Sequence, residues 1–172
     1  MTRAFVGVGS NIEPAENVRA ALRLLAKDTR VVAVSTVYET EPEERPEQPR
    51  YFNCVVEIET EAPPRELKRT LRAIEERLGR VRSDDRYAPR AVDLDLLVYD
   101  DVAGQAEGTT LPNPDIVSRP YLAVALAELA PELTLPGTDV TAAEMAKSLS
   151  RRGMRALGEY SAALKREVAH GR

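Results

Sequence analysis

The sequence predicts an α+β fold with a ferredoxin-like β-α-β-β-α-β core, in which a mostly antiparallel sheet carries its helices on one face and helical additions follow at the C-terminal side. Two observations support this prediction. Segments of alternating hydrophobicity and segments of helical period succeed one another in that order. Two long charged segments, at about residues 40–50 and 80–90, separate them, and loops of that length in a compact domain are usually functional or disordered.

The first half of the core begins with residues 4–11, AFVGVGSN, which predict a short strand that ends in a Gly-Ser-Asn turn. Residues 13–28 predict a helix because Val18, Leu22 and Leu25 recur at helical spacing. Residues 30–40, rich in Val and Thr, predict a strand. Residues 41–50 hold three prolines among many charges and predict a loop.

Residues 51–60 alternate as a strand does. One face would carry Phe52, Cys54, Val56 and Ile58, and the other Tyr51, Asn53 and Val55. Residues 63–79 form the strongest predicted helix, with prolines at the start, Gly79 at the C′ position and an apolar stripe of Leu67, Leu71, Ile74 and Leu78. The fourth core strand would place Val92, Leu94, Leu96 and Val98 on one face.

The remaining residues predict a loop, a helix that ends near residue 127 and two further helices within residues 136–172. At 172 residues we expect one domain, 1–172, in which 136–172 is a C-terminal extension whose role the sequence leaves open.

Composition excludes several kinds of chemistry. The single histidine, His170, makes histidine-based acid–base catalysis, a Ser-His-Asp triad and a histidine-ligated zinc improbable. The single cysteine, Cys54, excludes an intramolecular disulfide and suits a small core residue in a reducing compartment. A net charge of −4 argues against a dedicated nucleic-acid partner. With no signal-like or membrane-spanning apolar run, we expect a cytoplasmic monomer without a membrane partner.

The segment GVGSN after a predicted strand invites comparison with a dinucleotide-binding fingerprint. The fit stops at Gly7 and Gly9, because Ile12 occupies the position of the third glycine. A tight strand-to-helix turn is the favoured interpretation, and a backbone contact to a ligand could coexist with it.

Asp93 and Asp95 are the most informative pair of residues. At i and i+2 of a strand they share a face roughly 6.5 Å apart, where two carboxylates repel by about 2–3 kcal/mol at an effective dielectric near 20. A solvent-facing edge is one explanation. The other is a magnesium site, since Mg²⁺ takes oxygen ligands, few of them from protein and the rest from water and substrate phosphates.

Arginines precede these aspartates at positions 80, 82, 86 and 90. A solvated loop partly neutralised by Asp84 and Asp85 would explain them. Alternatively, their guanidinium groups would bind phosphate bidentately and offset the charge that develops in phosphoryl transfer.

The spacing of Arg86-Tyr87-Ala88-Pro89-Arg90 from Asp93-Leu94-Asp95-Leu96-Leu97 is a demanding pattern. With VGSN, VYETEP, QPRYFN, IEERLGRVR, LPNP and RPYLAVALAELAPEL in order, the chain resembles the 6-hydroxymethyl-7,8-dihydropterin pyrophosphokinase family of folate biosynthesis over most of residues 4–135. The resemblance implies transfer of the β,γ-diphosphate of ATP to the hydroxymethyl group of the pterin, with release of AMP.

The resemblance also implies residue roles. Asp93 and Asp95 would hold two Mg²⁺ ions. Arg80, Arg82 and Arg90 would be catalytic. ATP would contact Glu75, Arg80, Arg86, Arg90, Asn113 and Arg119. The pterin would lie against Thr40, Tyr51, Asn53, Tyr87 and Tyr121.

The chain departs from the family pattern at three places, where Asn113 replaces a common histidine, Tyr87 replaces a loop tryptophan, and Glu41, Glu43 and Glu44 make the first loop acidic. These changes leave the metal ligands intact and bear on kinetics and loop closure. A ferredoxin-like RNA-binding module and a family member that binds without turnover remain alternatives.

Overall fold

The computed structural model describes residues 1–81 and 83–170, and it confirms the predicted α+β fold. The core elements are β1 (Thr2–Ser10), α1 (Pro14–Asp28), β2 (Arg30–Val34), β3 (Tyr38–Thr40), β4 (Tyr51–Thr60), α2 (Pro64–Arg77) and β5 (Asp93–Tyr99). The later elements are β6 (Gly104–Ala106), β7 (Thr109–Leu111), α3 (Asp115–Ser118), α4 (Pro120–Leu129), α5 (Ala142–Lys147), β8 (Met154–Ala156) and α6 (Gly158–His170).

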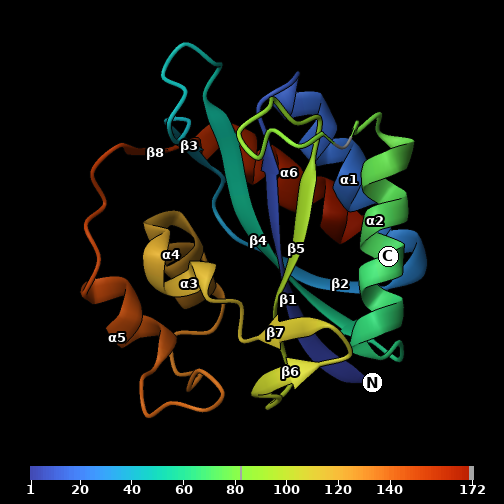
Figure 1. Ribbon diagram of the computed structural model, residues 1–172, viewed down its shortest axis with the longest axis vertical. Helices are drawn as coiled ribbons and strands as arrows, with labels where there is room; N and C mark the ends of the chain where they lie inside the picture. Colours follow the sequence, from blue (N-terminus) through green and yellow to red (C-terminus); the bar gives the residue numbers. More distant parts are fainter. Residues whose placement is uncertain (82, 171–172) are drawn as a thin grey trace.

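The main sheet has the order β5-β1-β4-β3-β8, and β2 pairs with β4 beside β3. All pairings between the described strands are antiparallel. Strands β5, β1 and β4 run side by side through the centre of Figure 1, and β6 and β7 form a separate hairpin. This order and orientation are those of the ferredoxin-like plan that the sequence predicts.

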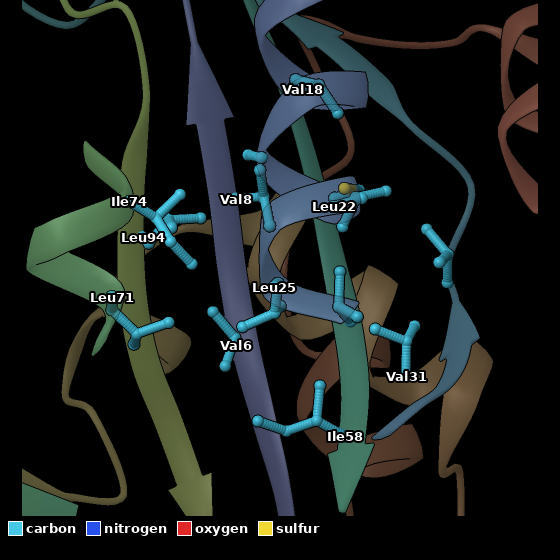
Figure 2. Close-up of a cluster of buried hydrophobic side chains, with 14 of the residues drawn as sticks. Val6, Val8, Val18, Leu22, Leu25, Val31, Ile58, Leu71, Ile74 and Leu94 are labelled. Carbon is cyan, nitrogen blue, oxygen red and sulfur yellow. The ribbon is translucent and has the colours of Figure 1, made fainter. Parts of the chain in front are cut away.

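Helices cover both faces of the sheet, whereas the sequence predicted helices on one face. On the first face, Val6 and Val8 of β1 are buried with Leu22 and Leu25 of α1 and with residues of α2 (Figure 2). On the second face, Phe5, Val55 and Leu97 are buried with side chains of α4. The sequences of β1 and β4 indicate this second layer, because both faces of each strand carry apolar residues, as expected for strands buried on two sides.

The segment predicted as one strand over residues 30–40 is two strands. Ser35 interrupts it: its backbone N–H donates to Val55 O at 2.9 Å, and its hydroxyl accepts from Val55 N at 2.9 Å. Thr36 then turns toward α4, where its N–H donates to Glu128 Oε1 at 2.9 Å. Because a side chain replaces part of the ladder, β2 and β3 pair with different parts of β4.

A β-bulge changes which face of the sheet the side chains at the end of β5 occupy. The β1–β5 register shifts between Phe5 and Val6, so that Phe5 pairs with Val98 and Val6 with Leu96. Leu97 and Val98 therefore both join the cluster under α4. The prediction that Val98 shares a face with Val92, Leu94 and Leu96 was wrong for Val98 alone.

The C-terminal residues extend the core on both sides. Strand β8 pairs with β3, and α5 packs against α4. Helix α6 packs against α1, and Tyr160 donates its hydroxyl proton to Ala15 O at 2.6 Å. The two predicted helices are confirmed, and β8 was not predicted.

Both long loops lie at the same end of the sheet, beside the end of β1 and the start of β5 (Figure 1). Gly79 has φ +87° at the end of α2, as its predicted C′ position requires. Cys54 is 1% exposed in the core, and burial raises the pKa of its thiol to about 12. None of the helices in the described part of the chain is long and apolar enough to cross a membrane.

Candidate active site

A pocket with a polar lining lies on the second face of the sheet. Asp93 and Asp95 of β5 pair with Gly9 and Gly7 of β1, which confirms that both aspartates share one face. Both glycines and both aspartates line the pocket. A glycine brings no side chain, so the backbone of β1 itself forms the bottom between β5 and β4. Gly9 therefore lies in the strand and not in the predicted Gly-Ser-Asn turn, and both glycines line the pocket.

The residues predicted to contact the pterin gather in this pocket. Thr40, Tyr51, Asn53, Tyr87 and Tyr121 all line it. The side chain of Asn53 donates from Nδ2 to Thr40 Oγ1 at 2.7 Å, and both residues are buried. Burial raises the pKa of both Tyr51 and Tyr121, so their rings present neutral phenols. Buried amide and hydroxyl groups beside aromatic faces suit a flat, polar ring.

Arginines surround Asp93. Arg80 donates from Nη1 to Asp93 Oδ1 at 2.6 Å, and Arg90 donates from Nη1 to Asp93 Oδ2 at 2.8 Å. Burial would raise the pKa of Asp93, but the two guanidinium groups outweigh it and hold that pKa below its ordinary value. Charge-assisted hydrogen bonds of this kind keep both carboxylate oxygens occupied.

Glu75 completes the same ion-pair network from α2. It contacts Nη1 of Arg80 through Oε2, and the same oxygen accepts from Leu94 N at 3.1 Å. Glu75 is 3% exposed, and burial raises the pKa of its carboxyl. It therefore fixes Arg80 against β5 from the first face of the sheet.

Asp95 stands in a different environment from Asp93. Burial, followed by the charges of Asp93, Glu75 and Asp115, raises the pKa of Asp95 to about 7, against a smaller opposing effect of Arg119. None of the described residues donates a hydrogen bond to its carboxylate. The site thus holds one carboxylate that two arginines pair and one that, within the described part of the chain, has no hydrogen-bond donor.

Arg119 lies at the start of α4 across the pocket. Its Nη1 donates to the hydroxyl of Tyr121 at 3.3 Å, and its Nε lies 3.7 Å from Glu43 Oε1 and 3.8 Å from Asp115 Oδ2. These neighbours raise the already high pKa of the guanidinium, so it stays charged. The acidic first loop therefore reaches into the site, because the carboxylate of Glu43 lies beside the guanidinium of Arg119.

A second pocket meets the first at Asp93 and Asp95. The predicted ATP contacts Glu75, Arg80 and Asn113 line it, and so do three residues that the sequence did not single out: Lys68, Arg72 and Thr109. Lys68, Arg72 and Glu75 recur at helical spacing along α2, a signal that could have identified them. Thr109 carries a buried hydroxyl with no hydrogen-bond partner in the described residues.

Asn113 has a local structural role as well. Its side-chain Oδ1 accepts from Asp115 N at 2.9 Å, and its backbone N–H donates to Leu97 O at 2.7 Å. Asparagine commonly holds such a turn through its side chain. The residue therefore shapes the turn into α3 while it lines the second pocket.

Part of the second long loop, at about residues 80–90, lines the first pocket. Arg86 and Arg90 line the first pocket, and the guanidinium of Arg86 lies 5.0 Å from the centre of the Tyr87 ring. Arg82 lies outside the described residues. Asn11 and Gln48, which connect this loop to the first long loop, were not predicted as site residues.

The metal-ligating potential of the site is limited to carboxylates. Among the described residues, no group of three or more His, Cys, Asp or Glu side chains is arranged to hold a metal ion. Asp93 and Asp95 could supply two carboxylate ligands, which suits a cation that takes most of its ligands from water and substrate.

The fold and the site define a class of protein: an α+β phosphoryl-transfer enzyme whose arginines and carboxylates meet where two pockets join. Residues 5–131 match the model of the family described as 7,8-dihydro-6-hydroxymethylpterin-pyrophosphokinase (HPPK). The chain belongs to this family.

Curated relatives carry the same description. A protein of Haemophilus influenzae named 2-amino-4-hydroxy-6-hydroxymethyldihydropteridine pyrophosphokinase is 37% identical over 143 residues, which cover 81% of this chain and 89% of that protein. The protein of the same name from Pseudomonas aeruginosa is 39% identical over 137 residues, 78% of this chain and 84% of the relative.

Solved structures share the fold. A crystal structure of Plasmodium falciparum HPPK-DHPS with SDX-DHP superposes with a TM-score of 0.70 at 13% sequence identity. The match covers 91% of this chain and 47% of the other, so this chain spans about half the length of that protein. At this identity the likeness supports the fold alone.

Proposed function

We propose roles for individual residues in the reaction that the family of this chain catalyses. The chain is a pyrophosphokinase: it transfers diphosphate from ATP to the hydroxymethyl group of 6-hydroxymethyl-7,8-dihydropterin in folate biosynthesis. In that reaction the hydroxymethyl oxygen bonds to the β-phosphorus, the bond between the β-phosphorus and the α,β-bridging oxygen breaks, AMP leaves and the hydroxyl proton is released. The observation that supports the residue roles best is the meeting of both pockets at Asp93 and Asp95.

The two aspartates would hold Mg²⁺, two ions in our proposal. The residues fit a divalent cation, because the Asp95 carboxylate lies among acids without a hydrogen-bond donor from the described residues. Asp93 would be free to bind the cation once the guanidinium groups of Arg80 and Arg90 leave its carboxylate and bind phosphate oxygens instead. Bound there, the ions would neutralise charge on the triphosphate and orient it.

Arg80, Arg90 and Arg119 would bind the phosphate groups from two sides of the pocket. Their guanidinium groups remain charged and match the geometry of phosphate oxygens. Each has a carboxylate partner now, which a phosphate would replace. Arg82, which lies outside the described residues, and Arg86 would join them when the loop closes.

The pterin would occupy the first pocket. Thr40 and Asn53 would hydrogen-bond its amide edge, and the rings of Tyr51 and Tyr121 would pack on its faces, with Tyr87 closing from the loop. Closure of both loops would exclude water before transfer.

The nucleoside part of ATP would occupy the second pocket. Glu75 and Asn113 line that pocket, and Lys68 and Arg72 add positive charge at its rim. The shared aspartates would then lie between the nucleoside and the pterin, where the transferred diphosphate must be.

The chain as a whole would act as one domain over residues 1–172 and as a monomer. Contacts of the C-terminal extension support the single domain, since β8 joins the sheet and α6 packs on α1. Size-exclusion chromatography with light scattering tests the monomer, and a mass of twice 19.0 kDa would contradict it.

The reaction is tested by incubating the protein with ATP, Mg²⁺ and 6-hydroxymethyl-7,8-dihydropterin. We expect AMP and pterin diphosphate in equal amounts. ADP would indicate a different phosphoryl transfer. Ligand binding without either product would indicate a member that binds without turnover, the alternative that the contact between Glu43 and Arg119 keeps open. Salt-dependent retention of RNA on a filter would support the RNA-binding alternative.

A further inference from the structure

A cavity with a volume of about 510 Å³ lies where α4, α5 and β3 meet. Tyr38 of β3, Val124 of α4 and Ala146 of α5 are among the residues that line it. Of the described residues that line this cavity, none also lines either pocket of the proposed active site. Small-molecule sites commonly have volumes of about 300–1,000 Å³, so this cavity, which we call the α4–α5 cavity, is large enough for a ligand.

The walls of the α4–α5 cavity are apolar and partly aromatic. Buried or half-buried aliphatic side chains form most of the wall: Val124, Ala127, Ala143, Ala146 and Leu149. The half-buried ring of Tyr38 adds an aromatic surface. A ligand that removes these surfaces from water gains binding free energy in proportion to the apolar area it covers. The walls therefore favour a ligand with an aromatic or apolar body.

The rim of the cavity carries one acid and two cations. The acid, Glu128, already has partners, because its Oε1 accepts from Thr36 N at 2.9 Å and from Lys165 Nζ at 3.2 Å. The cations are Lys147 and Arg151, both exposed. Neither forms an ion pair or a side-chain hydrogen bond with the described residues. The rim therefore offers two positive charges without a direct counter-charge in the described part of the chain.

Arg151 acts electrostatically on the aromatic wall. Burial and the charge of Glu128 raise the pKa of the Tyr38 phenol, whereas the charge of Arg151 lowers it. The guanidinium group therefore lies near the ring that lines the cavity. A guanidinium group binds a carboxylate through two parallel hydrogen bonds, and an ammonium group such as that of Lys147 adds a point charge. These two groups suit an anion of the carboxylate type.

The C-terminal extension completes the cavity. Helix α5 and Arg151 lie beyond residue 131, where the match to the family model ends. The chain leaves α5 and runs past α4 toward β8 at the left of Figure 1. The matched part of the chain thus supplies one side of the cavity, and residues 136–172, whose role the sequence left open, supply the other with both unpaired cations.

We propose that the α4–α5 cavity is a second ligand site, which takes a small carboxylate with an aromatic or apolar body. The body would lie against Tyr38 and Val124, and the carboxylate would bind Lys147 and Arg151. This site goes beyond the pyrophosphokinase reaction, because it is separate from the pockets that we assign to the pterin and the nucleotide.

The test uses 2-naphthoate, a fluorescent aromatic carboxylate, as the ligand. Its fluorescence anisotropy is measured against the concentration of the full chain, which has no tryptophan to interfere. We expect saturable binding. Arg151→Gln should raise the dissociation constant about threefold, and Lys147→Gln combined with Arg151→Gln about tenfold, as loss of exposed ion pairs would. The neutral analogue 2-naphthamide should bind the wild type and the double variant equally.

The matched control is Arg152→Gln. Arg152 follows Arg151 directly and is also exposed, but it does not line the cavity, so its dissociation constant should equal that of the wild type. Arg119→Gln removes a cation of the first pocket and should also leave 2-naphthoate binding unchanged. Ala143→Leu narrows the cavity without a change of charge and should weaken binding of both naphthalene ligands.

Each outcome decides the inference. Weaker binding of 2-naphthoate in the Lys147 and Arg151 variants, with both arginine controls unchanged, supports the site. Absence of saturable binding, or equal binding by the wild type and the double variant, overturns it. An equal loss in Arg152→Gln would show a general effect of surface charge, and a loss in Arg119→Gln would place the ligand in the first pocket. Either of these results also overturns the proposal.

Discussion

Asp93 and Arg90 are joined by a hydrogen bond of 2.8 Å between Oδ2 and Nη1, and Arg80 takes the other oxygen of the same carboxylate. Two residues further along β5, Asp95 has acids around it and no such donor among the described residues. The two aspartates of one motif therefore differ in what they contribute to the ligand-free fold. Asp93 is held by ion pairs with Arg80 and Arg90, whereas burial among other acids makes an ionised Asp95 costly.

Asp93→Asn and Asp95→Asn should both abolish turnover but have different effects on stability. Asp93→Asn leaves Arg80 and Arg90 without their carboxylate and should lower the free energy of unfolding by about 1–3 kcal/mol. Asp95→Asn removes an uncompensated charge and should leave that free energy equal or higher. Urea denaturation at pH 7.5 without Mg²⁺ measures both values. Normal turnover in Asp95→Asn would refute its assignment as a metal ligand.

The stability of the metal-free protein should fall as pH rises from about 4 to about 7. The pKa of Asp95 is about 7 in the folded chain and 3.8 ordinarily, so between these values the folded state binds more protons than the unfolded state. The cost is absent below pH 4 and complete above pH 7. Denaturation at pH 5 and pH 8 checks this sign. Asp95→Asn should flatten the slope, and an identical slope in that variant would contradict the assignment.

Glu43→Gln should strengthen ATP binding. Glu43 Oε1 lies 3.7 Å from Arg119 Nε and competes with phosphate for that guanidinium. Glu43 is exposed and Arg119 is half-buried. Exposed ion pairs contribute about 0.2–1 kcal/mol, so we expect KM for ATP to fall about twofold to fivefold. Glu44→Gln is the control, because no ion pair joins Glu44 to the described residues. Equal effects of both variants would indicate a general charge effect of the loop.

The sequence predicted much of the site because several of its residues lie two apart on one strand, a spacing that can be recognised without knowledge of the fold. Asp93 and Asp95 share a face through the period of a strand, and Tyr51 and Asn53 face them from β4 for the same reason. What it missed depends on contacts distant in sequence. The bulge at Leu97 arises from pairing with β1, and the break at Ser35 from bonds to Val55.

The second layer of helices and the role of the glycines were missed for a related reason. The pattern of apolar residues within β1 cannot show which strands lie beside it, so Gly9 was assigned to a turn. Only the pairing of Gly7 and Gly9 with Asp95 and Asp93 makes them the floor of a pocket. Similarly, Thr109 is ordinary in sequence and becomes notable because its hydroxyl is buried and unpartnered.

Thr109→Val should stabilise the free protein. The substitution keeps the shape of the side chain and removes a buried hydroxyl that has no partner in the described residues. We expect a gain of about 1 kcal/mol in the free energy of unfolding. Thr60→Val is the control, since Thr60 is also buried but its hydroxyl accepts from Ala62 N at 3.1 Å, and its loss should destabilise. Destabilisation by Thr109→Val would mean that the hydroxyl has a partner in solution.

Gly9→Ala should weaken pterin use and leave ATP use intact. A Cβ at this position would lie 2.9 Å from Asn53 Oδ1, closer than such atoms approach, so the Asn53 amide must move. That movement would break its 2.7 Å hydrogen bond to Thr40 and misplace the two groups that we assign to the amide edge of the pterin. We expect KM for the pterin to rise about tenfold, in line with the loss of about 1.4 kcal/mol of binding, with KM for ATP unchanged. Gly158→Ala, where a Cβ meets nothing within 4 Å, is the matched control. Because the extra methyl group lies on the strand between Asp93 and Asn53, an equal rise in both KM values would show that the aspartates moved as well. An unchanged pterin KM would remove Asn53 from the pterin site.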